Sequence, residues 1–372
     1  MYNILTLNKI AACGTDRFDS KYTCSDSFEN PTAVMVRSAS MHETEFSDET
    51  LAIARAGAGT NNIPVDKCAE KGIVVFNTPG ANANAVKELV ICGLLLASRK
   101  VTAAYDWAKT LKGEGEAVGK LVEKGKSQFA GPEIMGKTLG VIGLGAIGFK
   151  VAQAAEALGM KIVGYDPFLS EKVKSALSPQ TEIVEDINDI FKKSDYITIH
   201  VPLNDATKDT VNKDTLALCK DGIRILNFAR GGLVNSEDII EALASGKAAA
   251  YVTDFPSDEV IGVDGVIAIP HLGASTPESE DNCAVMAADE LMAYIEKGEI
   301  VNSVNMPAMP LDKVDGARTC VICKAEAVQA VCAALGENAK SAVRGAFGYC
   351  VADADVEGVK DIDGVIRVRI IK

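Results

Sequence analysis

An α/β fold built on doubly wound parallel sheets is predicted by three features of this sequence. Short apolar runs alternate with segments of helical periodicity along most of the 372 residues, a pattern typical of strand–helix–strand units. A glycine-rich turn at residues 143–148 joins one apolar run directly to a helical segment. The chain is longer than one domain usually is. We therefore expect more than one sheet.

Composition excludes several classes of protein. The hydrophobic fraction of 48% and the charged fraction of 24% are typical of a globular protein. A net charge of −13 argues against nucleic acid as a partner, although a local basic pocket could still hold a small anion. The most apolar stretch, residues 89–97, is too short to cross a bilayer. We expect no membrane partner.

The first residues and the cysteines suggest a cytoplasmic location. Residues 1–10 lack a basic stretch followed by a long apolar core, so they read as a strand rather than a signal peptide. Ten cysteines are scattered along a long chain, which favours reduced thiols over a disulfide framework. Cys320 and Cys323 form a CxxC, but residues three apart on a strand point to opposite faces and no second CxxC exists. We expect no metal.

The first part of the chain predicts a small parallel sheet. A short helix, residues 65–71, is closed by Gly72 and lies between the last two apolar runs. This alternation predicts a flavodoxin-like, doubly wound domain formed by residues 1–88 and completed by residues 276–310. Its strands are expected at Asn3–Leu7, Ala33–Val36, Ala52–Arg55 and Ile73–Phe76.

Residues 85–99 form an apolar helix that we expect to enter a second domain, residues 89–275. Residues 111–129 are rich in glycine and charge and predict an exposed connection with helical pieces. Further helices are expected at 187–193, 213–219 and 236–245. The strands, which with the two around the glycine turn make a six-stranded sheet, are expected at Tyr196–His200, Arg224–Phe228, Ala249–Asp254 and Val266–Ile269.

The glycine turn carries the strongest signal. It follows a strand, Leu139–Ile142, opens a helix, Phe149–Leu158, and is followed after the next strand, Lys161–Tyr165, by Asp166. This is the context of a dinucleotide-binding Rossmann unit. Gly143 would permit the tight turn, Gly145 would let the pyrophosphate approach, and Gly148 would allow close helix–strand packing. The alternative is an ordinary crossover whose glycines serve packing. A carboxylate at the ribose favours NAD over NADP.

A long helix at 276–297, begun by Thr276 and Pro277, would return the chain to the first domain. Residues 311–372 then predict a small α+β domain, with strands at 319–323, 341–344, 349–352 and 365–370 and a helix at 325–335. About sixty residues are few for an independent core, so this domain should dock or dimerise.

Titratable groups follow three successive strands of the Rossmann domain. Arg230, Glu259 and His271 all fall at the edge where ligands bind in open α/β sheets. Such a set suits hydride chemistry on a 2-oxo acid, in which an arginine grips the carboxylate, a histidine moves the proton and an acid orients the imidazole. Each alone could be structural. His200, at another strand end, is either structural or next to the cofactor.

Cations also follow the strands of the first domain. Arg37 and Arg55 stand at strand ends and suit an anionic substrate, since the guanidinium fork donates two parallel hydrogen bonds. Lys87 lies in the first turn of a helix, where it opposes the helix dipole. Each of the three could instead be a solvated surface charge.

These motifs together resemble the D-isomer-specific 2-hydroxyacid dehydrogenase family. The resemblance rests on the glycine turn and on the segments 227–232, 254–259 and 270–276. Segments 36–39, 55–59, 77–80 and 304–307 resemble the members that act on a phosphorylated acid. The resemblance covers most of residues 1–310. It implies NAD-dependent oxidation of 3-phospho-D-glycerate, the entry to serine synthesis, in a dimer or tetramer built through the cofactor domains.

The resemblance also implies roles for individual residues. Arg230, Glu259 and His271 would be catalytic. The substrate would be held by Arg37, Ser38, Arg55, Ala58, Gly59 and Lys87. The cofactor would contact Gly143, Gly145, Ala146, Ile147, Gly148, Asp166, His200, Val201, Pro202, Phe228, Ala229, Arg230, Asp254, His271, Gly273 and Ala274.

Some positions depart from the family pattern. Asn61–Asn62 replaces an acidic residue followed by asparagine, Phe228 stands where a small residue is commoner, Lys87 replaces an alanine, and no proline follows Glu259. Residues 311–372 resemble an ACT regulatory domain whose second helix is cut down to 356–361, without the His–Asn pattern of serine-sensing versions. We expect docking or dimerisation there rather than serine inhibition.

Two other functions stay open. The chain could act on an unphosphorylated acid such as lactate, glycerate or hydroxypyruvate, which needs fewer cations. It could also be an NAD-sensing binding protein, against which the set of Arg230, Glu259 and His271 argues.

Overall fold

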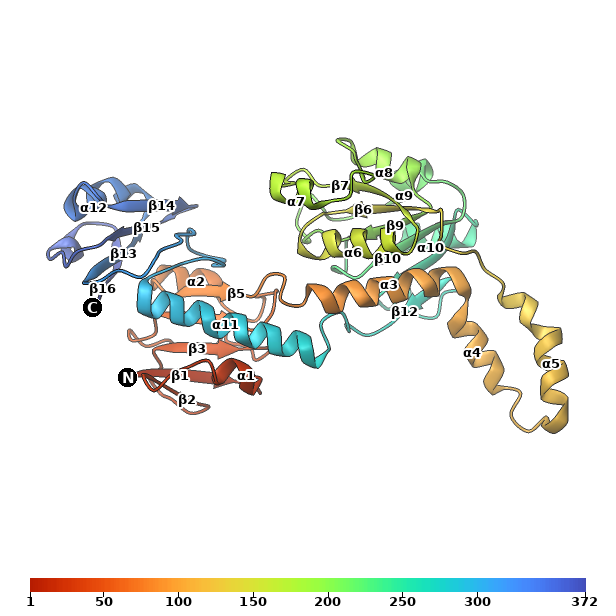
Figure 1. Cartoon of the computed structure of the whole chain (residues 1–372), viewed down its shortest axis with the longest axis horizontal. Helices are drawn as coiled ribbons and strands as arrows, with labels where there is room; N and C mark the ends of the chain where they lie inside the picture. The colour runs from red at the N-terminus through yellow and green to blue at the C-terminus, as the bar shows by residue number, and fades with distance from the viewer. The chain divides into compact units, whose positions relative to one another are not determined.

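The computed structural model describes residues 1–372 and divides into two compact units (Figure 1). One unit comprises Met1–Asn82 with Thr276–Lys372, and the other comprises Ala83–Ser275. The expected boundary after residue 88 falls inside α3 (Ala83–Arg99), a continuous helix that packs on α6 (Ala146–Ala157) of the second unit. The observed division therefore comes before that helix.

The first unit contains a five-stranded parallel sheet in the order β2-β1-β3-β4-β5. This strand order is that of flavodoxin-like folds, the kind of doubly wound domain that the sequence predicted. The edge strand β2 was not expected, because its sequence YTCS is short and mostly exposed and carries no apolar run. The strands are β1 (Tyr2–Leu7), β2 (Tyr22–Ser25), β3 (Ala33–Val36), β4 (Ala52–Arg55) and β5 (Val74–Asn77).

Helices cover both faces of this sheet. The long helix α11 (Pro277–Lys297) and the short α1 (Ala12–Thr15) lie on one face, where Met35, Phe76 and Leu291 share a core. Helix α2 (Val65–Glu70) lies on the other. Thr276 caps α11 by accepting a hydrogen bond from the Ser279 amide, and Pro277 occupies the first turn, as the sequence predicted.

The second unit contains a seven-stranded parallel sheet in the order β12-β11-β10-β9-β6-β7-β8. Six strands were expected; the seventh, β8, has only two residues at the edge, too few to leave a sequence pattern. The order reverses between β6 and β9, which is the point where Rossmann sheets bind dinucleotides. The strands are β6 (Thr138–Ile142), β7 (Lys161–Tyr165), β8 (Glu182–Ile183), β9 (Tyr196–Ile199), β10 (Ile223–Asn227), β11 (Ala248–Thr253) and β12 (Val266–Ala268).

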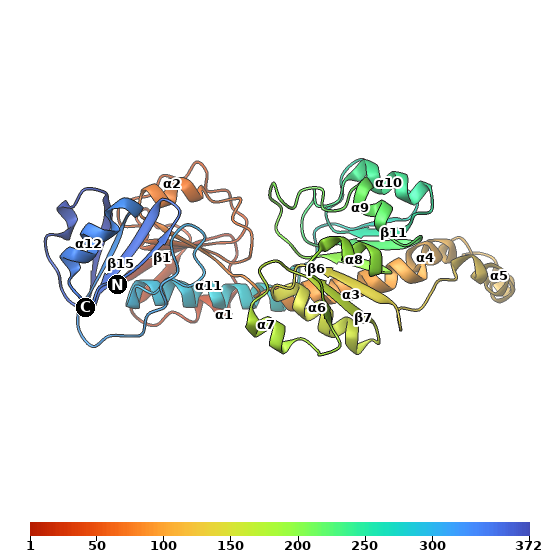
Figure 2. The ribbon, with the colours of Figure 1, turned by 90° about the horizontal axis from the view of Figure 1, so that it is seen from above.

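Two helical layers bury this second sheet. Helices α3 and α6 share one core with Val141, Leu226 and Val252, and they run side by side in both views (Figures 1 and 2). Helices α8 (Ile187–Lys193), α9 (Lys213–Leu218) and α10 (Ser236–Ala244) share the opposite core. A shorter helix, α7 (Glu171–Ala176), follows β7. Alternate residues of the strands face the two cores, as a fully covered parallel sheet requires.

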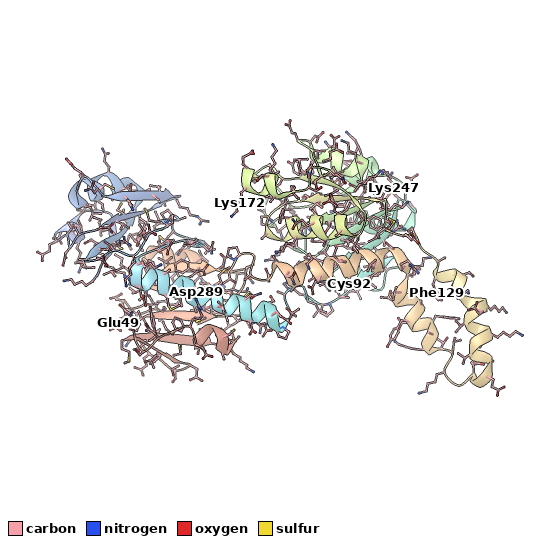
Figure 3. All side chains as sticks on the ribbon, viewed as in Figure 1. Glu49, Cys92, Phe129, Lys172, Lys247 and Asp289 are labelled. Atoms are coloured by element: carbon pink, nitrogen blue, oxygen red, sulfur yellow. The ribbon has the colours of Figure 1, made fainter.

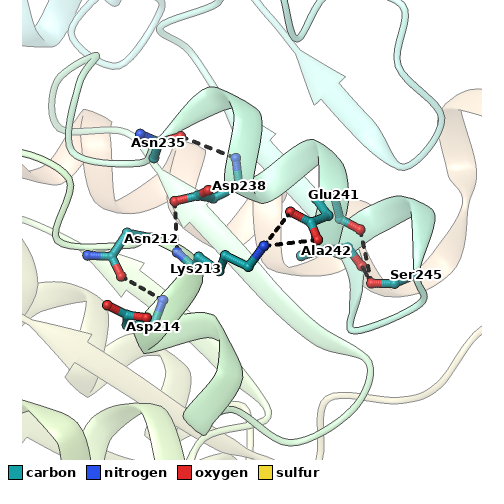
Figure 4. A network of polar contacts seen from close by, with 8 residues as sticks. All are labelled: Asn212, Lys213, Asp214, Asn235, Asp238, Glu241, Ala242 and Ser245. Carbon is teal, nitrogen blue, oxygen red and sulfur yellow. Dashed lines mark hydrogen bonds and ion pairs between the residues drawn. The ribbon is translucent and has the colours of Figure 1, made fainter.

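The starts of α9 and α10 are tied together by a polar network (Figure 4). Asn212 and Asn235 each cap one helix with the side-chain oxygen. Asp238 of α10 accepts a hydrogen bond of 2.8 Å from the backbone amide of Lys213, whose ammonium pairs with Glu241 at 3.1 Å. This network holds two helices that follow strands β9 and β10 in a fixed relation.

A helical arm leaves the body of the second unit, where the sequence predicted an exposed connection (Figures 1 and 2). It consists of α4 (Val101–Lys109), η1 (Gly115–Ala117), α5 (Val118–Gly125) and η2 (Lys126–Phe129), and none of these helices has a buried residue. Trp107 and Phe129, the latter labelled in Figure 3, pair across the arm with ring centroids 5.4 Å apart. The arm is therefore held together mainly by its own contacts.

The C-terminal segment forms an antiparallel sheet in the order β14-β15-β13-β16, backed by one helix. Cys320, Ile322, Tyr349 and Val351 face the α11 side of the first unit and join its core. The C-terminal segment thus docks on the first unit through this shared core, as its small size led us to expect. The elements are β13 (Arg318–Lys324), η3 (Ala325–Ala327), α12 (Val328–Leu335), β14 (Lys340–Arg344), β15 (Phe347–Ala352), η4 (Val359–Asp361) and β16 (Val365–Ile371).

Donors from this C-terminal sheet cap the end of α11. Arg318 donates to the carbonyl of Lys297, Arg369 donates to the carbonyl of Ile295, and the Tyr349 hydroxyl donates to the carbonyl of Gly298. Cations suit this end of a helix because its last carbonyls carry partial negative charge. None of the helices in the structure combines the length and apolar character needed to span a bilayer.

Candidate active site

The second unit gathers its chemistry at one edge of the sheet. Register pairs Ile142 with Tyr165 and with Ile199, and pairs Asn227 with Ile199 and with Thr253. The carboxyl ends of these parallel strands therefore lie in a row. The glycine turn, Asp166, His200, Arg230 and Asp254 follow directly, so the residues predicted from separate segments come from one edge.

The glycine turn has the shape that a dinucleotide pyrophosphate needs. Gly143 has φ +91°, and a Cβ there would lie 2.8 Å from the carbonyl oxygen of His200. A Cβ on Gly148 would lie 1.9 Å from the carbonyl oxygen of Gly143, whereas a Cβ on Gly145 would meet open space. No side chain caps the start of α6. The amides of that first turn are thus available to a phosphate.

Asp166 is held rigidly at the end of β7. One carboxylate oxygen accepts a hydrogen bond of 2.9 Å from the Leu144 amide in the glycine turn, and the other accepts one of 2.8 Å from the Phe168 amide. Each oxygen retains a further lone pair for a ribose hydroxyl. The Phe168 side chain, an apolar ring close to this acid, is 91% exposed. Phe168 was not singled out from the sequence, although its position two residues after Asp166 could have indicated a place near the ribose site.

Asp254 supplies a buried acceptor without a partner. Its Oδ2 accepts a hydrogen bond of 3.1 Å from the Gly273 amide, but its buried Oδ1 has none. Burial raises the pKa of this carboxyl, opposed by the Gly273 amide and by the nearby His271. A buried acceptor without a donor is costly. An N–H group of a bound ligand would satisfy it.

Arg230, Phe255 and His271 form a row along the loops after β10, β11 and β12. The Phe255 ring lies 4.4 Å from the His271 ring, centroid to centroid, and the Arg230 guanidinium carbon lies 5.8 Å from the Phe255 centroid. Arg230 and His271 are exposed. The structure therefore places an arginine and a histidine against one aromatic ring. Phe255 was missed because its segment was read for charged residues only.

Glu259 does not contact His271 in this structure, contrary to the pairing expected from the sequence. No ion pair or hydrogen bond joins the two side chains, and the imidazole instead packs against the Phe255 ring with the two planes tilted by 45°. Glu259 interacts with the Ser257 hydroxyl, which lowers the pKa of its carboxyl. The acid is therefore ionised and exposed in the loop after β11, on the same strand-end edge.

The structure gives two residues predicted to contact the cofactor, Phe228 and His200, surroundings that the sequence did not reveal. Phe228 is buried and its ring points to α3, where a Cβ on Gly93 would lie 2.7 Å away, so its side chain cannot line a cofactor. His200 shares a hydrogen bond of 3.0 Å with Thr198, and burial lowers its pKa to about 3, so its imidazole is neutral. The segments 145–147, 201–202, 229 and 274 reach the surface of this edge, and Gly273 is buried beneath it.

The first unit has its own strand-end site. Register aligns Val36 with Arg55 and Arg55 with Asn77. The Arg55 guanidinium folds over Gly57, where a Cβ would collide with it at 1.4 Å, and Gly57 has φ +146°. Asn77 donates a hydrogen bond of 2.6 Å to the carbonyl of Ala58. This loop, with Gly59, is thus shaped around the arginine.

Arg37 and Lys87 already have charged neighbours. The Arg37 guanidinium pairs with Glu280 of α11 at 2.6 Å, with both side chains about 40% exposed. In the other unit, the Lys87 ammonium lies 3.5 Å from Glu88. The amides of Ser38 and Ala39 donate to the Asn8 side chain, a contact that the sequence did not reveal. A substrate at Arg37 would have to compete with Glu280.

Comparison with known proteins agrees with this geometry. Residues 91–273 match the family model described as the NAD-binding domain of the D-isomer specific 2-hydroxyacid dehydrogenases. This match confirms NAD as the expected cofactor of the second unit. The match covers the glycine turn and extends to the loop that carries His271.

Curated relatives carry two names. D-3-phosphoglycerate dehydrogenase of Methanocaldococcus jannaschii is 38% identical over 73% of this chain and 50% of its own length. The enzyme of that name from Bacillus subtilis is 33% identical over 76% of this chain and 53% of its own length. Hydroxypyruvate reductase of Thermotoga maritima is 41% identical over 64% of this chain and 76% of its own length. The chain spans about half the length of the phosphoglycerate dehydrogenases that it matches.

Solved structures share the fold. NAD⁺-bound 3-phosphoglycerate dehydrogenase of Entamoeba histolytica superposes with a TM-score of 0.62 at 26% identity, over 82% of this chain and 98% of that one. D-mandelate dehydrogenase of Rhodotorula graminis gives 0.70 at 22% identity, over 84% and 99%. The predicted α/β fold class is confirmed by these neighbours.

Proposed function

The chain belongs to the D-isomer-specific 2-hydroxyacid dehydrogenase family, and we propose that it oxidises 3-phospho-D-glycerate to 3-phosphohydroxypyruvate with NAD, the first step of L-serine biosynthesis. The observation that carries the proposal is the Arg55 loop at the strand ends of the first unit, whose glycine leaves room for the guanidinium. The name shared by several relatives supports the same substrate.

In this proposal the second unit holds NAD, which when bound supplies the hydride acceptor. The glycine turn and the start of α6 bind the pyrophosphate, and Asp166 binds the adenosine ribose and disfavours a 2′-phosphate. The free Oδ1 of Asp254 accepts from the carboxamide. Phe168 offers an apolar ring near the adenosine. Further surface around the cofactor comes from Ala146, Ile147, Val201, Ala229 and Ala274.

Three side chains of the same edge carry the proposed chemistry. Arg230 binds the substrate carboxylate with its fork of N–H donors. His271 takes the hydroxyl proton as the carbonyl forms and returns it in the reverse direction. Glu259 approaches the other imidazole nitrogen once substrate is bound, which orients the ring and favours the imidazolium. Removing Glu259 should therefore shift the pH profile of His271.

The first unit is proposed to hold the rest of the substrate. Arg55, with the backbone of Ser38, Ala58 and Gly59, binds an anionic group, and Arg37 joins by exchanging Glu280 for phosphate. On the second unit, Lys87 is also proposed to bind substrate. We further propose that residues 311–372 act as a docked C-terminal domain and that the protein is a homodimer or homotetramer built through its NAD-binding units.

A second candidate is reduction of unphosphorylated hydroxypyruvate. It is favoured by the identity to the Thermotoga reductase and by the ion pair that already occupies Arg37. A non-catalytic NAD sensor is a weaker alternative, because it has no need for an exposed arginine and histidine beside the proposed nicotinamide position.

Steady-state kinetics distinguish these functions. With NADH and purified protein, kcat/KM for 3-phosphohydroxypyruvate should exceed that for hydroxypyruvate by about 10²-fold, the effect of a charged group bound in a dedicated site. Arg55→Gln should remove most of that ratio and leave NADH affinity unchanged. Equal specificity constants for the two acids would favour the reductase, and NADH binding without turnover would favour the sensor.

A further inference from the structure

Three cysteines gather on one face of the C-terminal sheet. Cys323 lies on β13, Cys350 on β15 and Cys332 on α12, which packs over them. The sulfurs of Cys332 and Cys350 are 3.7 Å apart, at van der Waals contact. Their surroundings are otherwise apolar, with Val321, Val331 and Leu335 in the same core.

The CxxC visible in the sequence is not this cluster. Cys320 lies on the opposite face of β13, against Gly298 at the end of α11, where a Cβ on that glycine would come within 2.5 Å of its sulfur. Only Cys323 of the motif faces α12. The three thiols also do not form a metal site, since no group of three ligating side chains in the structure has that arrangement.

Geometry selects one pair among the three thiols. Val321 is the direct cross-strand partner of Cys350, so Cys323 is a diagonal neighbour. Diagonal residues have Cα atoms roughly 7–8 Å apart, beyond the usual reach of a disulfide of about 7 Å. Cys332 approaches from the helix and is under no such constraint. It is also the only thiol of the three that is partly exposed.

The surroundings of Cys350 favour its protonated thiol form. Hydrogen bonding with Cys323, burial and the neighbouring Cys332 all raise the pKa of the Cys350 thiol, while the same contact lowers the pKa of Cys323. Cys350 is therefore protonated, with its sulfur next to that of Cys332. An oxidant from solvent would meet Cys332 first, because access as well as thiolate character governs oxidation.

We propose that Cys332 and Cys350 are a peroxide-reactive pair that forms a reversible disulfide between α12 and β15. The Cys332 sulfur attacks one oxygen of hydrogen peroxide and the O–O bond breaks. That oxygen stays on the sulfur as sulfenic acid, and the other leaves as hydroxide, which takes up the proton released by Cys332 and becomes water. The Cys350 sulfur then attacks the Cys332 sulfur. The S–O bond breaks, and the hydroxyl departs with the Cys350 proton as a second water. Two thiols are thus oxidised and one hydroperoxide is reduced.

Mass spectrometry of the reduced full-length protein tests this pair. After treatment with one equivalent of hydrogen peroxide and alkylation of remaining thiols, a peptide linking Cys332 to Cys350 should appear and vanish on reduction by a dithiol. Because Cys24 and Cys92 are exposed, the experiment uses a background in which both are serine. The bond closes the loop that contains β14, so the unfolding midpoint of the unit that contains this sheet should rise by about 4 °C or more.

Variants separate the roles of the three thiols. Cys332→Ser, at the partly exposed position, should abolish the linked peptide with unchanged circular dichroism. Cys323→Ala should leave the link intact, and Cys350→Ala should trap Cys332 as a sulfenic acid that reacts with dimedone. A link to Cys323 in the parent protein would overturn the proposal, as would irreversible oxidation of Cys332 while Cys350 remains free to alkylate.

Discussion

At the scale of single residues, the proposal assigns proton transfer to His271, an exposed side chain that shares no hydrogen bond or ion pair with an acid. Its ring packs against the ring of Phe255, with centroids 4.4 Å apart. An exposed imidazole can be reached by a substrate hydroxyl, and its ring nitrogens can accept and donate a proton. His200, whose Nδ1 is buried without a partner and whose pKa burial lowers to about 3, is neutral by contrast.

His271→Ala should lower kcat by about 10²-fold or more and leave NADH affinity nearly unchanged, because the side chain acts on the substrate proton. Fluorescence titration with NADH and steady-state rates check both parts. Glu259→Gln is the companion variant. It should move the acidic limb of the pH–rate profile to lower pH while preserving folding. Loss of NADH binding in His271→Ala would mean that the histidine is structural.

Glu290 on α11 is a second residue with an unusual position. It is 7% exposed, its Oε1 accepts a hydrogen bond of 2.7 Å from Asn302, and its buried Oε2 has no partner. Burial, opposed by Asn302 and reinforced by Asp289, raises the pKa of this carboxyl to about 8. The folded protein therefore holds a proton here that the unfolded chain releases near its ordinary value.

The raised pKa of Glu290 predicts the sign of a pH effect. A group with a raised folded pKa contributes its full stability below the unfolded pKa and loses it as pH rises through the folded one. Stability should fall between about pH 4.5 and pH 8. Glu290→Gln keeps the acceptor for Asn302 and should raise stability at pH 8 by about 1–4 kcal/mol, measured by urea unfolding. Equal gains at pH 5 and pH 8 would contradict this origin.

At the scale of elements, α3 and the segment that directly follows β10 have complementary side-chain volumes. Phe228 carries a large ring where the family pattern has a small residue, and Gly93 of α3 leaves room for it. The sequence showed the phenylalanine as a departure but not its compensation, because the two residues are far apart along the chain.

Gly93→Ala should destabilise the second unit by about 1–3 kcal/mol, since the added Cβ would lie 2.7 Å from the Phe228 ring. Chemical denaturation measures the loss. Phe228→Leu in the same chain should recover much of it, because the two residues share one contact. Cys92→Ala, at the neighbouring exposed position of the same helix, is the control and should change stability little. An additive double variant would show that the ring is not the obstacle.

Element prediction from the sequence worked where periodicity is strong. β3, β4, β7 and α8 have the expected limits, because apolar runs or amphipathic turns bounded by glycine or polar caps define them. β2 and β8 were missed, since short exposed edge strands lack that pattern. The grouping of the candidate site residues at one edge of the sheet could be predicted, because the strands are parallel and their carboxyl ends lie together. The Phe255 stack, the Glu280 partner of Arg37 and the Cys332 contact depend on side-chain packing, which spacing does not encode.

At the scale of the whole molecule, the helical arm exposes apolar side chains along helices that bury no residue. Its helices α4 and α5 have nine and eight residues and bury none of them. Helices of this length are marginal in water unless an apolar face is packed. Yet Val101, Tyr105 and Val122 are 49%, 64% and 37% exposed. A second copy of the chain that covers the arm would explain why these residues are apolar.

The protein should therefore sediment as a dimer or larger species at micromolar concentration. Tyr105→Asp combined with Val122→Asp places two charges on the exposed apolar face of the arm and should shift the species toward monomer by at least about tenfold in Kd, since burying an unpaired carboxylate is costly. Sedimentation velocity measures the shift. Lys174→Glu on α7, exposed in the same unit but outside the arm, is the control and should leave the mass unchanged. A monomeric parent protein, or a variant that keeps the parent's mass, would place the interface elsewhere and leave the arm to pack on some other surface.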